Sequence, residues 1–131
     1  MTAEPQESTL ADQIAVVVEK YIAGLNTGTA DDIADLYAPG ATVEDPIGAP
    51  LRTTRAELVE FYGIITGMPH RTATLAWTKI AGDTAVFEFT LVTGTDDAQF
   101  SITPVDIMVF DENGRITSMR AVWDPSDLKQ V

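Results

Sequence analysis

The chain has 131 residues, a net charge of −12, 45% apolar residues and no cysteine. This length suits a single domain whose core can form without disulfide bonds or metals. The absence of cysteine excludes thiol catalysis, cysteine-based zinc sites and disulfide bonds. The negative charge argues against nucleic acids, anionic membrane surfaces and strongly anionic substrates as partners, but it does not disfavour a neutral apolar ligand.

The first eight residues, MTAEPQES, are polar and acidic, so we expect residues 1–8 to form a flexible tail. They lack the basic and apolar segments of a signal peptide, and no apolar run approaches the length of a transmembrane helix. We therefore expect a cytoplasmic protein without membrane insertion, folded as a single domain over 9–131.

Three stretches open with the helix-capping pattern Ser/Thr-x-x-acid and continue with apolar residues at helical spacing. These patterns begin at Thr9, Thr29 and Thr54. The predicted helices end near 26–28, at 39–40 and at 67–69, where glycine or proline follows. Each predicted helix carries one of the three tyrosines on its apolar face, namely Tyr21, Tyr37 and Tyr62.

The rest of the chain alternates between apolar and polar residues, which predicts strands. The predicted strands cover 41–46, 71–80, 84–92, 99–110 and 115–123. The second strand places Ala73, Leu75 and Trp77 on one face, and Pro104 predicts a bulge or bend in the fourth. Because helices come first and antiparallel strands follow, we expect an α+β fold with three N-terminal helices on one face of a curved, mostly antiparallel sheet.

Asp106 lies inside the apolar run VDIMVF, residues 105–110. By strand alternation it shares a face with Phe100, Ile102, Met108 and Phe110 if the register holds past Pro104. Because burial raises the pKa of a carboxyl group, such a residue would be a neutral acid able to donate a hydrogen bond. The alternative interpretation is an acid satisfied by its surroundings, or one at a bulge near solvent.

Asp45 has the same character, since it shares a face with Ala41 and Val43 while Glu44 points the other way. Its alternative interpretation is a turn signal, because Asp-Pro pairs commonly begin turns. The three inward tyrosines could likewise be ordinary core residues. The single histidine, His70, is best explained as an exposed loop residue, and no metal-binding His pair or phosphate-binding glycine loop is present.

Taken together, these residues resemble bacterial ketosteroid isomerase, the steroid Δ5-isomerase of the cone-shaped NTF2-like and SnoaL-like α+β superfamily. The segments that carry the resemblance are KYIAGLNTGTADDIADLYAPGATVEDPIG (20–48), AELVEFY (56–62) and VDIMVFDENGRITSMRAVW (105–123). The resemblance implies a cofactor-independent and metal-independent isomerase that moves the double bond of a 3-oxo-Δ5-steroid into conjugation.

The resemblance also implies the roles of individual residues. Asp45 matches the general base, while Tyr21 and a protonated Asp106 match the two donors of the oxyanion hole. Tyr37 and Tyr62 match the tyrosines that support Tyr21 by hydrogen bonds. The residues expected to contact a small apolar steroid-like substrate are Phe61, Phe87, Met119 and Trp123.

The sequence departs from the family pattern at Ile47, where an aromatic residue is common, and over 63–77 and 93–98, which leaves the choice of substrate open. Two other functions are compatible with the fold. One is a non-catalytic module for apolar-ligand binding or dimerisation. The other is an epoxide hydrolase or polyketide cyclase. An epoxide hydrolase commonly needs an Asp-Arg-Asp set, whereas the three candidate arginines fall in predicted loops or helix starts, namely Arg52, Arg55 and Arg71.

The resemblance further leads us to expect a homodimer. The segment 105–110 has apolar residues on both of its faces. Helices can cover one face of the sheet, so the other would need a partner subunit.

Overall fold

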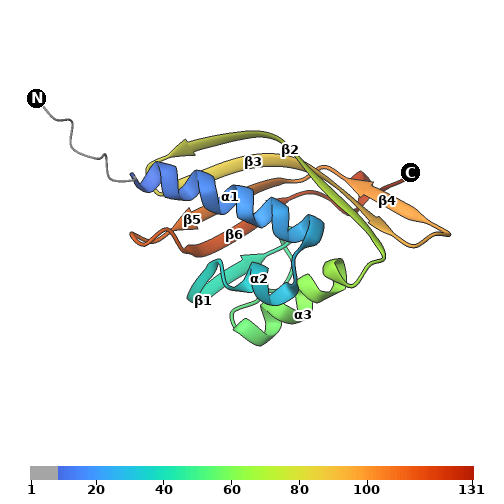
Figure 1. The fold of residues 1–131 in the computed structure, drawn as a ribbon, viewed down its shortest axis with the longest axis horizontal. Coiled ribbons are helices and arrows are strands. Elements are labelled where there is room, and N and C mark those ends of the chain that lie inside the picture. Colours follow the sequence, from blue (N-terminus) through green and yellow to red (C-terminus); the bar gives the residue numbers. More distant parts are fainter. Residues whose placement is uncertain (1–8) are drawn as a thin grey trace, which may run out of the picture.

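A computed structural model describes residues 9–131, and it shows an α+β protein in which three helices lie against a curved, mostly antiparallel sheet (Figure 1). This confirms the predicted fold class. The helices are α1 (Leu10–Thr27), α2 (Ala30–Ala34), α3 (Arg55–Thr66) and the short 3-10 helix η1 (Pro125–Asp127). The strands are β1 (Tyr37–Glu44), β2 (His70–Ala81), β3 (Thr84–Gly94), β4 (Gln99–Ile102), β5 (Val105–Phe110), β6 (Ile116–Val122) and β7 (Lys129–Gln130).

The tail predicted over 1–8 lies outside the described residues. Within the described part of the chain, no helix is both long and apolar enough to cross a membrane.

Strand β3 organises the sheet. It pairs with β2 along one edge, and along the other edge it pairs first with β5 and then with β4. Strands β4 and β5 are the two halves of the strand predicted over 99–110, which is interrupted at Thr103 and Pro104, as Pro104 indicated. Strand β6 pairs antiparallel with β5, and β1 joins β6 in a parallel pair. The interruption matters for the site, because residues on either side of it border the cavity described below.

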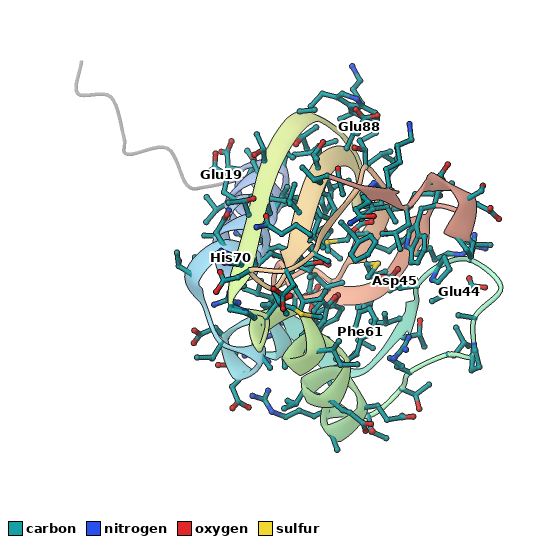
Figure 2. All side chains as sticks on the ribbon, turned by 90° about the vertical axis from the view of Figure 1, so that its right-hand side faces the viewer. Glu19, Glu44, Asp45, Phe61, His70 and Glu88 are labelled. Carbon is teal, nitrogen blue, oxygen red and sulfur yellow. The ribbon has the colours of Figure 1, made fainter. Side chains whose placement is uncertain are left out.

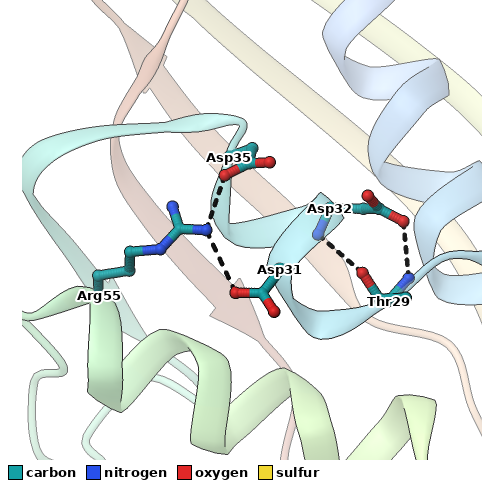
Figure 3. A network of polar contacts seen from close by, with 5 residues as sticks. All are labelled: Thr29, Asp31, Asp32, Asp35 and Arg55. Atoms are coloured by element: carbon teal, nitrogen blue, oxygen red, sulfur yellow. Dashed lines mark hydrogen bonds and ion pairs between the residues drawn. The ribbon is translucent and has the colours of Figure 1, made fainter.

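The three helices begin where the capping patterns predict. Thr9, Thr29 and Thr54 each accept a hydrogen bond from the backbone three residues later, and the acid at that position bonds back to the cap. Figure 3 shows this box at Thr29 and Asp32, beside Arg55 of α3, which contacts Asp31 at 3.3 Å and Asp35 at 2.7 Å. These contacts tie the start of α3 to α2, although ion pairs so exposed stabilise a fold little.

The second helix is shorter than its apolar pattern predicts. It ends at Ala34, and Tyr37 is the first residue of β1. The prediction that each helix carries one tyrosine is therefore wrong for Tyr37. The physical reason is a long-range pairing: Tyr37 aligns with Ile116 of β6, and the Ile116 amide donates to the Leu36 carbonyl at 3.0 Å.

Two side chains, Trp77 and His70, lie elsewhere than predicted. Trp77 does not share the face of Leu75, because the β2–β3 register shifts between them and leaves Trp77 45% exposed. Phe100 lies on the face of Asp106 as predicted, because β4 and β5 pair with β3 in one continuous register across Pro104, but it is 39% exposed near the start of β4. His70 is exposed as predicted, but it begins β2 instead of lying in a loop, and it contacts Asp96.

The core lies between the helices and the inner face of the sheet. The alternating pattern of β3 is confirmed, with its inward side chains buried at Ala85, Phe87, Phe89 and Leu91. Helix α1 packs across this face and runs in front of β3, β5 and β6 in Figure 1, while α2 and α3 lie together beside β1. All three tyrosines are at most 5% exposed, which confirms that they face inward.

Candidate active site

Tyr21, Asp45 and Asp106 meet at one cavity of about 210 Å³. They arrive from α1, from the residue after β1 and from the middle of β5, so no single element could have revealed the cluster. The remaining wall is made of apolar or aromatic residues, namely Leu25, Phe61, Ile65, Phe89, Leu91, Ile102, Pro104, Trp123 and Leu128. An apolar cavity with a few convergent polar groups suits an apolar ligand that carries one polar group.

The tyrosines form a chain of hydroxyl groups that leads to the cavity. The hydroxyls of Tyr21 and Tyr62 are 3.2 Å apart, and those of Tyr37 and Tyr62 are 2.5 Å apart. Tyr21 is further held edge-on against the rings of Phe87 and Phe89. Burial raises the pKa of all three tyrosines well above the ordinary value, so they are neutral hydroxyls that can donate hydrogen bonds.

Asp106 is 1% exposed and lies at the centre of the sheet, in register with Phe87 of β3 and Ala121 of β6. Neither of its carboxyl oxygens has a hydrogen-bond partner among residues 9–131. Burial raises the pKa of Asp106 well above its ordinary value, and the charge of Asp45 raises it further. This environment favours the neutral acid, whose proton is free to be donated into the cavity.

Asp45 is half-buried and has partners that Asp106 lacks. The indole Nε1 of Trp123 donates to its Oδ1 at 2.6 Å. Burial raises the pKa of Asp45, while the Trp123 hydrogen bond and the charge of Arg52 act in the opposite direction. A carboxylate with a single strong donor can stay ionised and still accept a proton from a bound molecule.

Arg52 does not border the cavity, but it contacts Phe61, which does. The backbone amide and carbonyl of Arg52 pair with those of Val43 at 2.9 Å each, two residues before Asp45. Its guanidinium carbon lies 4.1 Å from the ring centroid of Phe61, which borders the cavity and packs edge-on against Tyr62. Figure 2 labels Phe61 on α3 and Asp45 beyond the end of β1.

The four residues expected to contact a substrate are divided by the structure. Phe61 and Trp123 border the cavity, whereas Phe87 and Met119 are fully buried and do not. The pattern of β3 could have pointed to Phe89 and Leu91, because they share the inward face of Phe87. Leu25 and Ile65 lie one helical turn beyond Tyr21 and Phe61 and could have been found in the same way.

A larger hollow, of about 320 Å³, lies between α2, β1 and the start of α3. Asp35, Arg55 and Arg115 are among its lining residues, and it contains neither Asp45 nor Asp106. Charged walls of both signs do not suit an apolar ligand, so we place the site in the smaller, apolar cavity. Among residues 9–131, no group of three or more His, Cys, Asp or Glu side chains could hold a metal ion.

Comparison with known proteins places these residues in a family. The model of the SnoaL-like domain family matches residues 18–119. A protein named steroid Delta-isomerase from Nocardioides simplex is 42% identical over 119 residues, which cover 91% of this chain and 96% of that protein. A solved structure described as the epoxide hydrolase/cyclase-like enzyme SalBIII, in pyran ring formation in polyether salinomycin, covers 90% of this chain and 95% of its own.

That structure superimposes with a TM-score of 0.83 at 22% sequence identity, so it shows the fold alone. The family match spans most of the chain, including Tyr21, Asp45 and Asp106. On the evidence of the family model and the 42% identical relative, the chain belongs to the SnoaL-like domain family.

Proposed function

We propose that the protein is a cofactor-independent steroid Δ-isomerase. It would move the C5=C6 double bond of a 3-oxo-Δ5-steroid to C4=C5, in conjugation with the 3-oxo group. The observation that carries this proposal is the convergence of three groups on one apolar cavity: the Asp45 carboxylate, the Tyr21 hydroxyl and the unpartnered Asp106 carboxyl. The 42% identical relative is named for this activity.

In this mechanism Asp45 removes a proton from C4 of the steroid. The electrons of the broken C–H bond form a C3=C4 double bond, and negative charge develops on the 3-oxygen. The Asp45 carboxyl then returns the proton to C6, the C4=C5 bond forms and the 3-oxo group is restored. Atoms and electrons balance without a further reactant, and this is the mechanism established for ketosteroid isomerases.

Tyr21 and neutral Asp106 supply the two donors for the developing oxyanion. Because the Tyr21 hydroxyl donates its hydrogen bond to the substrate oxygen, its own oxygen accepts a hydrogen bond from Tyr62, whose oxygen in turn accepts one from Tyr37. The chain of hydroxyls thereby polarises the donor that faces the cavity. The apolar wall keeps water out, so these hydrogen bonds act in a medium of low dielectric.

The alternative of an epoxide hydrolase has less support in the geometry. Its Asp-Arg-Asp set needs an arginine in the cavity, and none of the three candidates borders it. Arg52 stacks on Phe61, Arg55 pairs with Asp31 and Asp35, and Arg71 donates to the Gly28 carbonyl at 2.7 Å. The similarity to the SalBIII structure concerns the fold, which serves several chemistries.

We further propose a cytoplasmic homodimer that uses the outer face of the sheet. One row of registered residues crosses this face from β2 to β6, namely Trp77, Glu88, Val105 and Val122. Trp77 and Val122 are each 45% exposed, although both are large and apolar. Burial of such a row against a second copy would remove apolar surface from water. Sedimentation equilibrium of the full chain tests this; a monomer at micromolar concentration would contradict it.

The reaction is tested by following the ultraviolet absorbance of the conjugated enone after mixing the protein with a Δ5-3-ketosteroid. Asp45→Asn is measured alongside, with Asp97→Asn as a control, because Asp97 is an exposed loop residue and the charge change is the same. Rapid conversion that is lost only in Asp45→Asn supports the proposal. A folded wild type that binds the steroid but does not convert it would favour the binding module.

A further inference from the structure

The base lies one residue beyond the end of β1, where the chain leaves the sheet. After Glu44 it turns through residues 45–48, and the Ile47 amide donates to the Ala121 carbonyl of β6 at 2.9 Å. Gly48 has a φ of 98°, a conformation that favours glycine. A residue outside the regular ladder depends on specific contacts for its position.

The side chain of Glu44 supplies two such contacts. One carboxylate oxygen accepts from the Gly48 amide at 2.9 Å and closes the turn around Asp45. The other accepts from Nε of Arg120 at 2.9 Å. Glu44 and Arg120 are register partners in the parallel β1–β6 pair, so this bond also joins the two strands at the point where β1 ends.

Side chains of β6 and of the residue that follows it therefore contact the turn around Asp45 from both faces of the sheet. Arg120 binds Glu44 on the outer face, while Trp123, just beyond the end of the same strand, binds the Asp45 carboxylate at 2.6 Å. In Figure 2 Asp45 lies toward the centre of the molecule and Glu44 nearer its edge, next to the loop that follows. The turn is held on one side and the carboxylate on the other.

We infer that Glu44 and Arg120 are positioning residues that fix the turn carrying the catalytic base. This inference rests on the proposed function, because it needs Asp45 to be the base. The same carboxylate has to reach C4 and then C6 of one steroid, so its position relative to the ring must be maintained throughout the reaction. A displacement of the order of 1 Å can cost about 10²-fold in rate.

Because the Glu44–Arg120 ion pair lies at the surface, its effect on turnover can be distinguished from its effect on the free energy of unfolding. The Arg120 side chain is 51% exposed and that of Glu44 is 20% exposed. Pairs this accessible contribute little to folding. Hydrogen bonds from the Gly48 amide and from Arg120 lower the pKa of Glu44, so the contact persists at neutral pH. Loss of the pair should therefore show in turnover more than in unfolding.

The test compares Glu44→Ala, Glu44→Gln and Arg120→Ala with Glu19→Gln, a control acid on the exposed side of α1. We expect kcat to fall about tenfold or more in Glu44→Ala. It should fall less in Glu44→Gln, whose amide oxygen still accepts from one donor, while affinity for the Δ4-3-ketosteroid product changes less than about twofold. Together, Glu44→Ala and Arg120→Ala should cost less than the product of their separate effects, because they remove one shared contact.

A second readout follows the base directly. The chain has two tryptophans, so the indole N–H resonance of Trp123 can be assigned with Trp77→Phe. In Glu44→Ala that resonance should shift, because the Asp45–Trp123 hydrogen bond loosens, while the thermal midpoint stays close to wild type. Sedimentation of each variant shows whether its oligomeric state has changed, since Arg120 is on the outer face.

The outcomes distinguish this inference from the function on which it rests. If Asp45→Asn abolishes turnover while Glu44→Ala and Glu44→Gln both stay within about twofold of wild type, the positioning role is overturned and the proposed function stands. If kcat falls only in proportion to a loss of folded protein, the pair is merely structural and the inference is again overturned. If Asp45→Asn keeps full turnover, both fail, because Asp45 is not the base.

Discussion

The cavity holds two carboxyl groups of the same residue type in opposite surroundings. Asp106 lies in the middle of β5, is 1% exposed and has no hydrogen-bond partner among residues 9–131. Asp45 lies just outside β1, is half-buried, and accepts a hydrogen bond from Trp123 at 2.6 Å. Burial raises the pKa of both, but at Asp45 the Trp123 bond and Arg52 oppose the shift, whereas at Asp106 the charge of Asp45 adds to it.

The difference shows how one type of side chain can serve as acid and as base in a single site. The first group to ionise is the one with a donor, and its charge then keeps the proton on the other. The surroundings of the two carboxyl groups, and not their residue type, therefore decide which one acts as the base and which one keeps its proton. Variants that remove Asp45 or Asp106, or that change the surroundings of one of them, test this difference.

The largest effect is expected for Asp45→Asn, which removes the base. Turnover of a Δ5-3-ketosteroid should fall by roughly 10²–10⁴-fold, since an amide cannot take the C4 proton. Steroid binding should be unchanged or tighter, because a neutral amide is easier to desolvate against the apolar steroid than an ionised carboxylate. Enone absorbance measures turnover and a fluorescence titration measures binding; unchanged turnover would remove Asp45 from the mechanism.

The other member of the pair is removed by Asp106→Leu. This change deletes one oxyanion donor, so kcat should fall by about 10²–10³-fold. Asp106→Asn should be milder, with a loss of about tenfold, because its amide can still donate a hydrogen bond. Equal losses in the leucine and asparagine variants would argue against a neutral donor at Asp106.

The sequence predicts a feature well when the interactions that decide it are local, and poorly when they join distant parts of the chain. Helix starts were predictable, because a capping box involves residues three apart, and all three are present. Inward placement of Asp106 followed from the alternation of its own strand. The end of α2 was not predictable, because Leu36 and Tyr37 fit either element and only the pairing of Tyr37 with Ile116 decides for a strand.

The cavity was predictable only in part, for the same reason. The resemblance identified Tyr21, Asp45 and Asp106, and the structure brings all three to one cavity. Leu128, in contrast, has no local signal, since it reaches the cavity only because β7 pairs with β4. Exposure of Trp77 likewise depends on a register shift against β3, which an alternating pattern does not reveal.

The raised pKa of Asp106 should also make the stability of the protein depend on pH. The pKa of Asp106 in the folded protein lies well above its pKa in the unfolded chain, which is about 3.9. The unfolded state therefore loses this proton first as pH rises, and the free energy of unfolding falls between that value and the folded pKa. In Asp106→Asn this decline is absent, so the variant should gain stability over wild type as pH rises from about 4 to about 7.

Each pKa unit of difference between the two states corresponds to about 1.4 kcal/mol. Urea unfolding of wild type and Asp106→Asn across this pH range measures the gap, with Asp97→Asn as the control for the loss of an exposed charge. A gap that stays constant with pH would mean that Asp106 ionises alike in both states, and the contrast with Asp45 would then lose its basis.

The smallest effect is expected for Trp123→Phe, which leaves both carboxyl groups in place and removes only the donor that distinguishes them. The Trp123 hydrogen bond lowers the pKa of Asp45, so without it that pKa should rise. The acid limb of the profile of kcat/KM against pH should move to higher pH, because Asp45 must be ionised to act. Above the limb, where the base is ionised in both proteins, turnover should change by only about threefold, since a more basic carboxylate partly offsets its poorer placement. Trp77→Phe, at a 45% exposed position on β2, is the matched control and should leave the profile unchanged. If turnover falls while the limb stays in place, Trp123 acts only as a wall of the cavity, and burial with Arg52 must account for the state of Asp45.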